Sequence, residues 1–114
     1  MRKESEHTSI RKAILEYLKA MGIPGWTVQN QGTYDPVKKI RRKFHGVKGI
    51  PDISCLPWRD GRTLYIEVKS KNDRLRPDQV EFHAMLKSRN APVMVARSVD
   101  DVQEYLKNEE EKDD

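Results

Sequence analysis

The chain has 114 residues, of which 36% are hydrophobic and 35% charged, and its formal net charge is +4 at pH 7. This length is typical of one domain with one modest core. We expect neither a membrane span, since no apolar run approaches about 20 residues, nor a secretory leader after Met1. A single cysteine, Cys55, excludes an internal disulfide and a Cys-rich zinc site, and it favours a cytoplasmic protein.

Charge is unevenly distributed along the chain. Residues 1–106 carry 20 basic and 13 acidic residues, whereas residues 107–114 (KNEEEKDD) are mostly acidic. We therefore expect one domain over residues 1–106, followed by an acidic, flexible tail over residues 107–114. Six basic residues and no acidic ones lie within residues 37–48 (VKKIRRKFHGVK). Such a segment can neutralise DNA phosphates, although a solvated loop or a patch for an acidic protein would have the same composition.

The first predicted element is a helix that ends near Gly22. Its apolar residues recur with helical spacing, and they are Ile10, Ala13, Ile14, Tyr17, Leu18 and Met21. Glu6 lies one turn before this stripe and on the same face. A carboxylate at this position either interacts with the helix dipole or points into a site.

Strand signals follow at residues 26–31 (WTVQNQ), 50–56 (IPDISCL), 63–70 (TLYIEVKS) and 92–97 (PVMVAR). The segment 32–49 is predicted to be a loop or an irregular hairpin, and Asp60-Gly61 indicates a hairpin turn. We expect the strand over residues 92–97 to be buried on both faces, and Trp26 to lie in the core.

Two further helices complete the pattern. Pro77 opens the first of them, whose expected apolar stripe is Phe82, Met85 and Leu86, with Gln79 at its edge. The second begins at a capping box near Ser98 and continues to about Leu106. The resulting order, α-β-β-β-α-β-α, predicts a three-layer α/β domain in which a mixed sheet is flanked by helices.

The residues that indicate chemistry are Pro51-Asp52 and Glu67-Val68-Lys69. Alternation along a strand places Glu67 and Lys69 on one face, about 7 Å apart, and the preceding strand of the hairpin brings Asp52 beside Glu67. Neighbouring carboxylates repel each other unless a proton or a cation intervenes, and Mg²⁺ or Mn²⁺ suits oxygen ligands. Such an ion can activate water against a phosphate. The arrangement therefore predicts phosphodiester hydrolysis, the alternative being a surface ion pair beside a turn aspartate.

In this order, these residues resemble the PD-(D/E)xK nuclease superfamily, which has a restriction-endonuclease-like core. The wider pattern resembles one branch of it, the virus-type replication-repair nuclease (VRR-NUC) domain, over roughly residues 5–106. A glutamate opens the first helix (SEHTSIRKAILEYL), Gly49-Ile50-Pro51-Asp52 leads into the hairpin, and Leu-Arg-Pro-Asp-Gln (residues 75–79) starts the next helix.

The resemblance implies a role for each matching residue. Asp52 and Glu67 would bind the metal directly, together with the backbone carbonyl of Val68, and Lys69 would be the catalytic lysine. Glu6 would bind the metal or its water, with Glu4 as the alternative, and Gln79 would support the site.

The resemblance further implies a metal-dependent, structure-selective DNA endonuclease, similar to Holliday-junction resolvases, that acts on branched DNA as a homodimer. No Gly-rich phosphate loop is present, so we expect no nucleotide cofactor. A flap or nicking nuclease acting as a monomer and a non-catalytic DNA-binding module are the alternatives. The expected DNA contacts are Lys38, Lys39, Arg41, Arg42, Lys43, His45 and Lys48.

The three histidines, His7, His45 and His83, lack the spacing of a zinc site. We expect them at the surface or at its edge, with His45 near phosphate.

Overall fold

The computed structural model describes residues 4–28, 34–35, 40–41 and 47–112. Within these residues, the helices are α1 (Glu6–Ala20), α2 (Pro77–Ser88) and α3 (Val99–Lys112), and the strands are β1 (Gly25–Thr27), β2 (Tyr34–Asp35), β3 (Ile40–Arg41), β4 (Ile53–Cys55), β5 (Leu64–Val68) and β6 (Val93–Ala96). The predicted order α-β-β-β-α-β-α is confirmed, with the pair β2–β3 inserted before β4.

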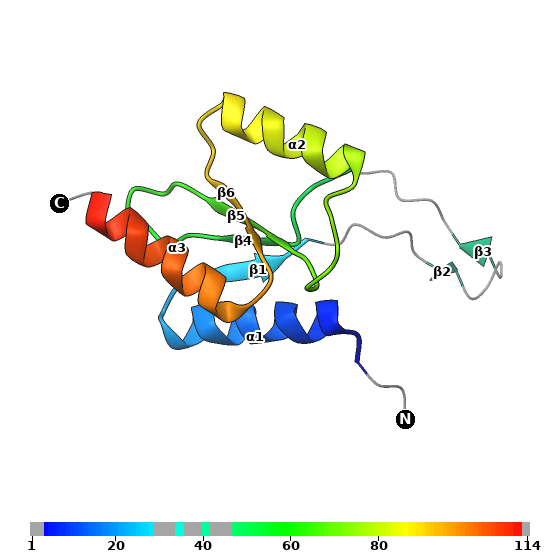
Figure 1. Cartoon of the computed structure of the whole chain (residues 1–114), viewed down its shortest axis with the longest axis horizontal. Helices are drawn as coiled ribbons and strands as arrows, with labels where there is room; N and C mark the ends of the chain where they lie inside the picture. The colour runs from blue at the N-terminus through cyan, green and yellow to red at the C-terminus, as the bar shows by residue number, and fades with distance from the viewer. Residues whose placement is uncertain (1–3, 29–33, 36–39, 42–46, 113–114) are drawn as a thin grey trace.

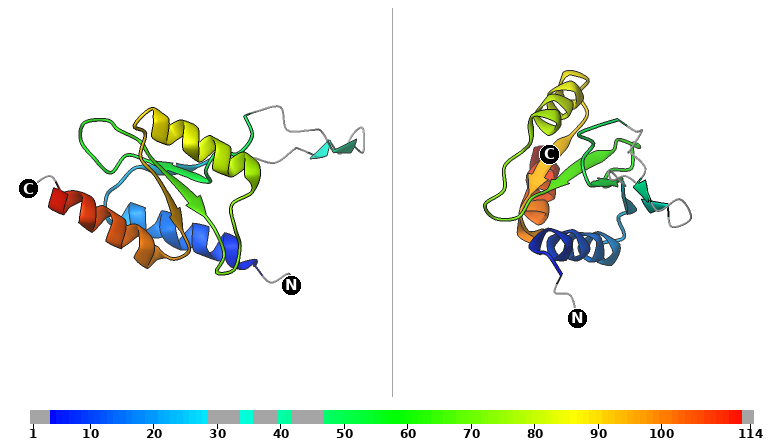
Figure 2. Two further views of the ribbon diagram at one scale, coloured as in Figure 1. Left: turned by 45° about the horizontal axis from the view of Figure 1, so that its top comes forward. Right: turned by 90° about the vertical axis from the view of Figure 1, so that its right-hand side faces the viewer.

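The main sheet has four strands in the order β1-β4-β5-β6. Strand β4 pairs antiparallel with both β1 and β5, whereas β6 pairs parallel with β5, so the sheet is mixed as expected. Helices α1 and α3 cover one face and α2 covers the other (Figure 1). Views from other sides show the same three layers (Figure 2). Strands β2 and β3 form a separate antiparallel pair.

The hydrophobic core lies between the sheet and the α1–α3 layer. Alternate residues of β5, namely Leu64, Ile66 and Val68, are fully buried on this face. They pack with Ile14 and Leu18 of α1, Ile53 and Cys55 of β4, Ala96 of β6 and Val102 of α3. Burial also raises the pKa of the Cys55 thiol to about 12, so this cysteine packs as a small apolar side chain.

Three expectations about the fold differ from the structure. Trp26 is 46% exposed, because β1 is an edge strand with an exposed burial pattern. Strand β6 is the opposite edge, and three of its residues are only half-buried, so it is not buried on both faces. Helix α3 continues to Lys112, and most of the tail that we expected to be flexible is therefore helical.

The α3 extension has a local explanation. Glutamate and lysine have high helix propensity, and Lys112 Nζ lies 3.1 Å from Glu109 Oε1 with helical spacing. Among the described residues, no helix combines the length and the apolar character required to cross a membrane.

Candidate active site

The site lies on the sheet face that α2 covers. Leu64, Ile66 and Val68 point toward α1 and α3, so the alternation of a strand turns Glu67 toward α2. Ile53 pairs with Ile66, so Asp52 and Glu67 are the next residues at this end of the two strands, and their side chains are in contact. Glu67 and Lys69 are both buried, with 1% and 7% of their surfaces exposed. The hairpin therefore brings the predicted Asp-Glu pair together, as expected from the sequence.

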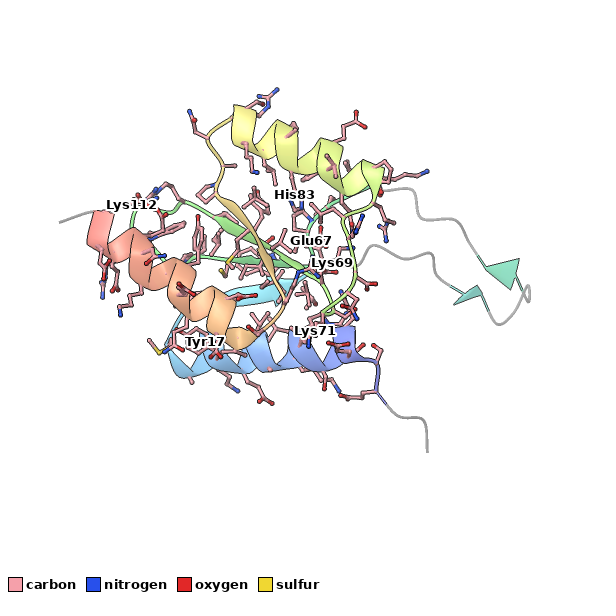
Figure 3. All side chains as sticks on the ribbon, in the orientation of Figure 1. Tyr17, Glu67, Lys69, Lys71, His83 and Lys112 are labelled. Carbon is pink, nitrogen blue, oxygen red and sulfur yellow. The ribbon has the colours of Figure 1, made fainter. Side chains whose placement is uncertain are left out.

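Two side chains of α2 hold the carboxylate of Glu67. His83 Nε2 lies 3.2 Å from Glu67 Oε1, and Gln79 Nε2 donates a hydrogen bond to Glu67 Oε2 at 3.4 Å. In Figure 3, His83 on α2 lies next to Glu67, and Lys69 follows at the end of β5. Gln79 also accepts a hydrogen bond from the backbone N–H of Arg76 at 2.9 Å, which caps the first turn of α2. The start of this helix is thereby tied to the site.

The protonation of Glu67 is strongly perturbed. Burial raises the pKa of Glu67 to about 9, and the hydrogen bond and charge of neighbouring Asp52 act in the same direction, outweighing Lys69 and Arg76, which lower it. The pKa of His83 is lowered, first by burial and then by the positive charges of Lys87 and Lys69. The imidazole is therefore a neutral partner of Glu67.

Asp52 is held at the opposite side of the pair. The backbone N–H of Val68 donates to Asp52 Oδ2 at 2.9 Å, which fixes the aspartate against the end of β5. His7 of α1 approaches the same oxygen at 3.5 Å and is partly exposed. Each of the two carboxylates thus has an imidazole near it, from a different helix.

The segment that begins at Lys69 is fixed by contacts from α1, from β6 and from the residue that follows β6. The backbone N–H of Lys69 donates to Ala96 of β6 at 3.0 Å, and Glu6 Oε1 accepts from the backbone N–H of Lys71 at 3.2 Å. Arg97 Nη1 donates to the carbonyl of Ser70 at 2.6 Å. The first-helix acid Glu6 therefore lies at the strand exit, beside the site. Glu4 instead forms an ion pair with Lys12.

Our reading of the second helix was wrong about its buried face. We expected the stripe Phe82, Met85 and Leu86, but the buried residues are Gln79, His83 and Leu86. Met85 is 37% exposed. The helix is turned this way because Glu67, on the facing strand, requires hydrogen-bond donors, which a purely apolar face would not supply.

The expectation that the histidines lie at the surface was also wrong for His83, which is 5% exposed. His83 follows Gln79 by four residues, so the two side chains share one helix face. That spacing is the signal that could have identified it. His7 is the residue after Glu6 in the first turn of α1, so both side chains start from the same helix end.

Most of the expected DNA contacts lie outside the described residues, namely Lys38, Lys39, Arg42, Lys43 and His45. Arg41 belongs to β3 and pairs through its backbone with Tyr34. Lys48 is exposed. It precedes Gly49, which packs against the backbone of Asp78 at the start of α2. The end of the basic segment is therefore next to the helix that carries Gln79.

The donor set fits a hard divalent cation. Asp52 and Glu67 present carboxylate oxygens side by side, and the raised pKa of Glu67 means that the pair requires a proton or a cation at neutral pH. Among the described residues, no group of three or more His, Cys, Asp or Glu side chains could hold a metal ion. Any cation here would complete its shell with backbone oxygen, water or phosphate.

A three-layer α/β domain with a partly buried Asp and a Glu-x-Lys at the adjoining ends of two paired strands has the architecture of a nuclease-type, DNA-processing domain. The model of the VRR-NUC domain matches residues 4–100 of the sequence. The chain belongs to the VRR-NUC family.

Solved structures support the same fold. A VRR_NUC domain superposes with a TM-score of 0.69 and 21% identity, over 91% of this chain and 97% of that chain. A VRR_NUC domain protein superposes with a TM-score of 0.59 and 18% identity, over 94% of this chain and 89% of that chain. No curated protein matches the sequence.

Proposed function

We propose that this chain is a Mg²⁺- or Mn²⁺-dependent endonuclease that hydrolyses phosphodiesters in branched DNA, in the manner of a Holliday-junction resolvase. The observation that carries the proposal is the buried Glu67, whose pKa is raised first by burial and then by the adjacent Asp52, with the buried Lys69 directly after the end of the same strand. A buried glutamate beside a partly buried aspartate and a buried lysine is expensive for folding. It is typical of a site in which a bound ligand compensates these charges.

Asp52 and Glu67, with the carbonyl of Val68, would hold the metal ion, and Glu6 would contact the ion or its water from the start of α1. The ion would supply Lewis acidity toward a phosphate oxygen and a lowered pKa for bound water. Lys69 would donate hydrogen bonds to the attacking water or to the phosphate, where its charge offsets the charge that develops during the reaction. Gln79 would hold Glu67 in place.

Contacts to the DNA backbone would come from the basic segment 37–48, which leads directly into Asp52. Phosphate contacts position DNA without reading its sequence, which agrees with selection by shape. A homodimer would place two such sites at a fixed separation, as two symmetric cuts in a four-way junction require.

The test is a cleavage assay with end-labelled substrates. A four-way junction, a flap and a linear duplex are incubated with Mg²⁺, with Mn²⁺ or with EDTA. We expect paired, symmetric nicks in the junction that disappear in EDTA. Cutting mainly of the flap would favour the monomeric nicking enzyme, and no metal-dependent cutting of any substrate would favour the non-catalytic DNA-binding module.

Lys69→Ala is the catalytic variant for this assay. We expect it to lower the cleavage rate at least about 100-fold while DNA affinity is retained. Lys71→Ala is the matched control, because Lys71 is an exposed lysine at the same strand exit and should retain most of the activity. Equal activity in both variants would remove Lys69 from the mechanism.

A further inference from the structure

His83 is the buried polar residue of α2 for which the proposed chemistry has no role. Its side chain is 7% exposed and contacts Glu67, whose side chain is 2% exposed. The two residues come from different layers and are 16 positions apart in the sequence. The contact of His83 is polar, because its ring nitrogen faces the buried carboxyl group of Glu67, so an apolar residue of similar size would not replace it.

The geometry restricts how the Glu67 carboxylate can rotate. The terminal torsion of a glutamate is broad when the group is free. Here His83 contacts Oε1 at 3.2 Å and Gln79 contacts Oε2 at 3.4 Å, so both oxygens are engaged from the side of α2. Each carboxylate oxygen can accept further interactions, and the side toward Asp52, where the two carboxyl groups share a hydrogen bond without metal, is the side on which a cation could replace that proton.

Gln79 makes the weaker of the two contacts with Glu67. Its contact with Glu67 is the longer of the two, and its other end is bound to the backbone of Arg76 as the cap of α2. His83 lies one turn further along the same face of the helix. Together the two residues make the orientation of the carboxylate depend on the position of α2.

We propose that His83 is a positioning residue, which orients the Glu67 carboxylate so that its side toward Asp52 binds a divalent cation shared by the two residues. This inference rests on the proposed function, because it assumes that Asp52 and Glu67 bind metal. Groups that hydrogen-bond to metal-ligating side chains typically change metal affinity by about 10- to 100-fold when they are removed.

The test measures Mn²⁺ binding by isothermal titration calorimetry, without DNA, for the whole chain and three variants. His83→Leu keeps most of the side-chain volume and removes the nitrogen that faces Glu67. His83→Gln restores an amide, which can donate or accept a hydrogen bond, near the position of Nε2. Asp52→Asn tests the metal site itself. Thermal unfolding in EDTA establishes that each variant is folded.

We expect Mn²⁺ affinity to fall about 10- to 100-fold in His83→Leu, to recover most of that loss in His83→Gln, and to be abolished in Asp52→Asn. The Mn²⁺ concentration for half-maximal cleavage should rise in His83→Leu and return close to the wild-type value in His83→Gln. The kcat at saturating Mn²⁺ should change less in both variants. If His83→Leu is unfolded in EDTA, His83→Asn replaces it. The asparagine side chain is one methylene shorter than that of glutamine, so its amide should not reach Glu67.

Two results would overturn the inference in distinguishable ways. Wild-type affinity in His83→Leu, or no recovery in His83→Gln, would assign His83 a packing role only and leave the metal site intact. No Mn²⁺ binding by the wild-type chain would overturn the proposed function, and the role of His83 would fall with it.

Discussion

Glu67 is the residue in which burial and a neighbouring charge act together. Both effects raise its pKa to about 9, compared with an ordinary value of 4.5. In the absence of metal, the folded protein therefore binds this proton more tightly than the unfolded chain does. The stabilisation is fully present below about pH 4.5 and is lost as the pH rises toward 9.

Glu67→Gln should remove this pH dependence. In EDTA, the free energy of unfolding of the wild-type chain should decrease between pH 5 and pH 9, by at most about 1.4 kcal/mol per pH unit. The variant should be the more stable protein at pH 8, because a neutral amide replaces a carboxylate that is ionised in the unfolded chain and must take up a proton on folding. Urea unfolding at several pH values measures both curves, and parallel curves would contradict the assigned pKa.

At the scale of elements, the turn at residues 47–50 packs closely against α2, and this contact positions Asp52 relative to the helix that carries Gln79. Gly49 has a φ of +83°, and a Cβ at this position would lie 2.3 Å from the backbone oxygen of Asp78. Glycine is therefore required for two reasons, a left-handed backbone and contact with another main chain. The turn leads through Pro51 to Asp52, and Asp78 adjoins Gln79, so this contact joins the two halves of the site.

Gly49→Ala should destabilise the protein by about 2–4 kcal/mol, because left-handed strain adds to a backbone clash that cannot relax locally. Gly61→Ala is the matched control. Gly61 has a φ of +86° with nothing within 4 Å of a built Cβ, so only the strain of about 1 kcal/mol applies. Chemical denaturation compares the two variants, and equal losses would show that the approach to α2 is not tight.

Across the whole molecule, charge separates into a basic segment before Asp52 and an acidic end of α3. Residues 37–48 carry six basic residues, whereas residues 107–114 carry five acidic ones. In Figure 1 the carboxyl end of α3 lies on the opposite side of the molecule from β2 and β3. DNA, which is negatively charged, can therefore approach the side of β2 and β3 without meeting the acidic residues of α3.

The double variant Arg41→Ala, Arg42→Ala should weaken binding to all DNA sequences alike. Two phosphate contacts fewer should also reduce the slope of log K against log salt by about 2. Fluorescence anisotropy over a salt series with two unrelated duplexes measures both effects. A change in sequence preference would instead mean that these arginines contact bases.

The sequence alone was sufficient for those features that depend on neighbouring residues. Alternation in LYIEV placed Glu67 and Val68 on opposite faces, and the Asp60-Gly61 turn signal predicted the hairpin that brings Asp52 and Glu67 together. The order of helices and strands followed from the same local periodicities.

Tertiary structure decided what lies across the layers. Which face of α2 meets the sheet depends on the buried carboxyl group of Glu67, which needs hydrogen-bond partners, and Gln79 and His83 therefore face inward in place of Phe82 and Met85. The exposure of Trp26 likewise follows from the position of β1 at the sheet edge. Periodicity indicates only which residues share a face of a helix or strand. Packing between segments distant in the chain decides what that face contacts. In this packing, burying a polar group without a hydrogen-bond partner costs more than leaving an apolar side chain exposed.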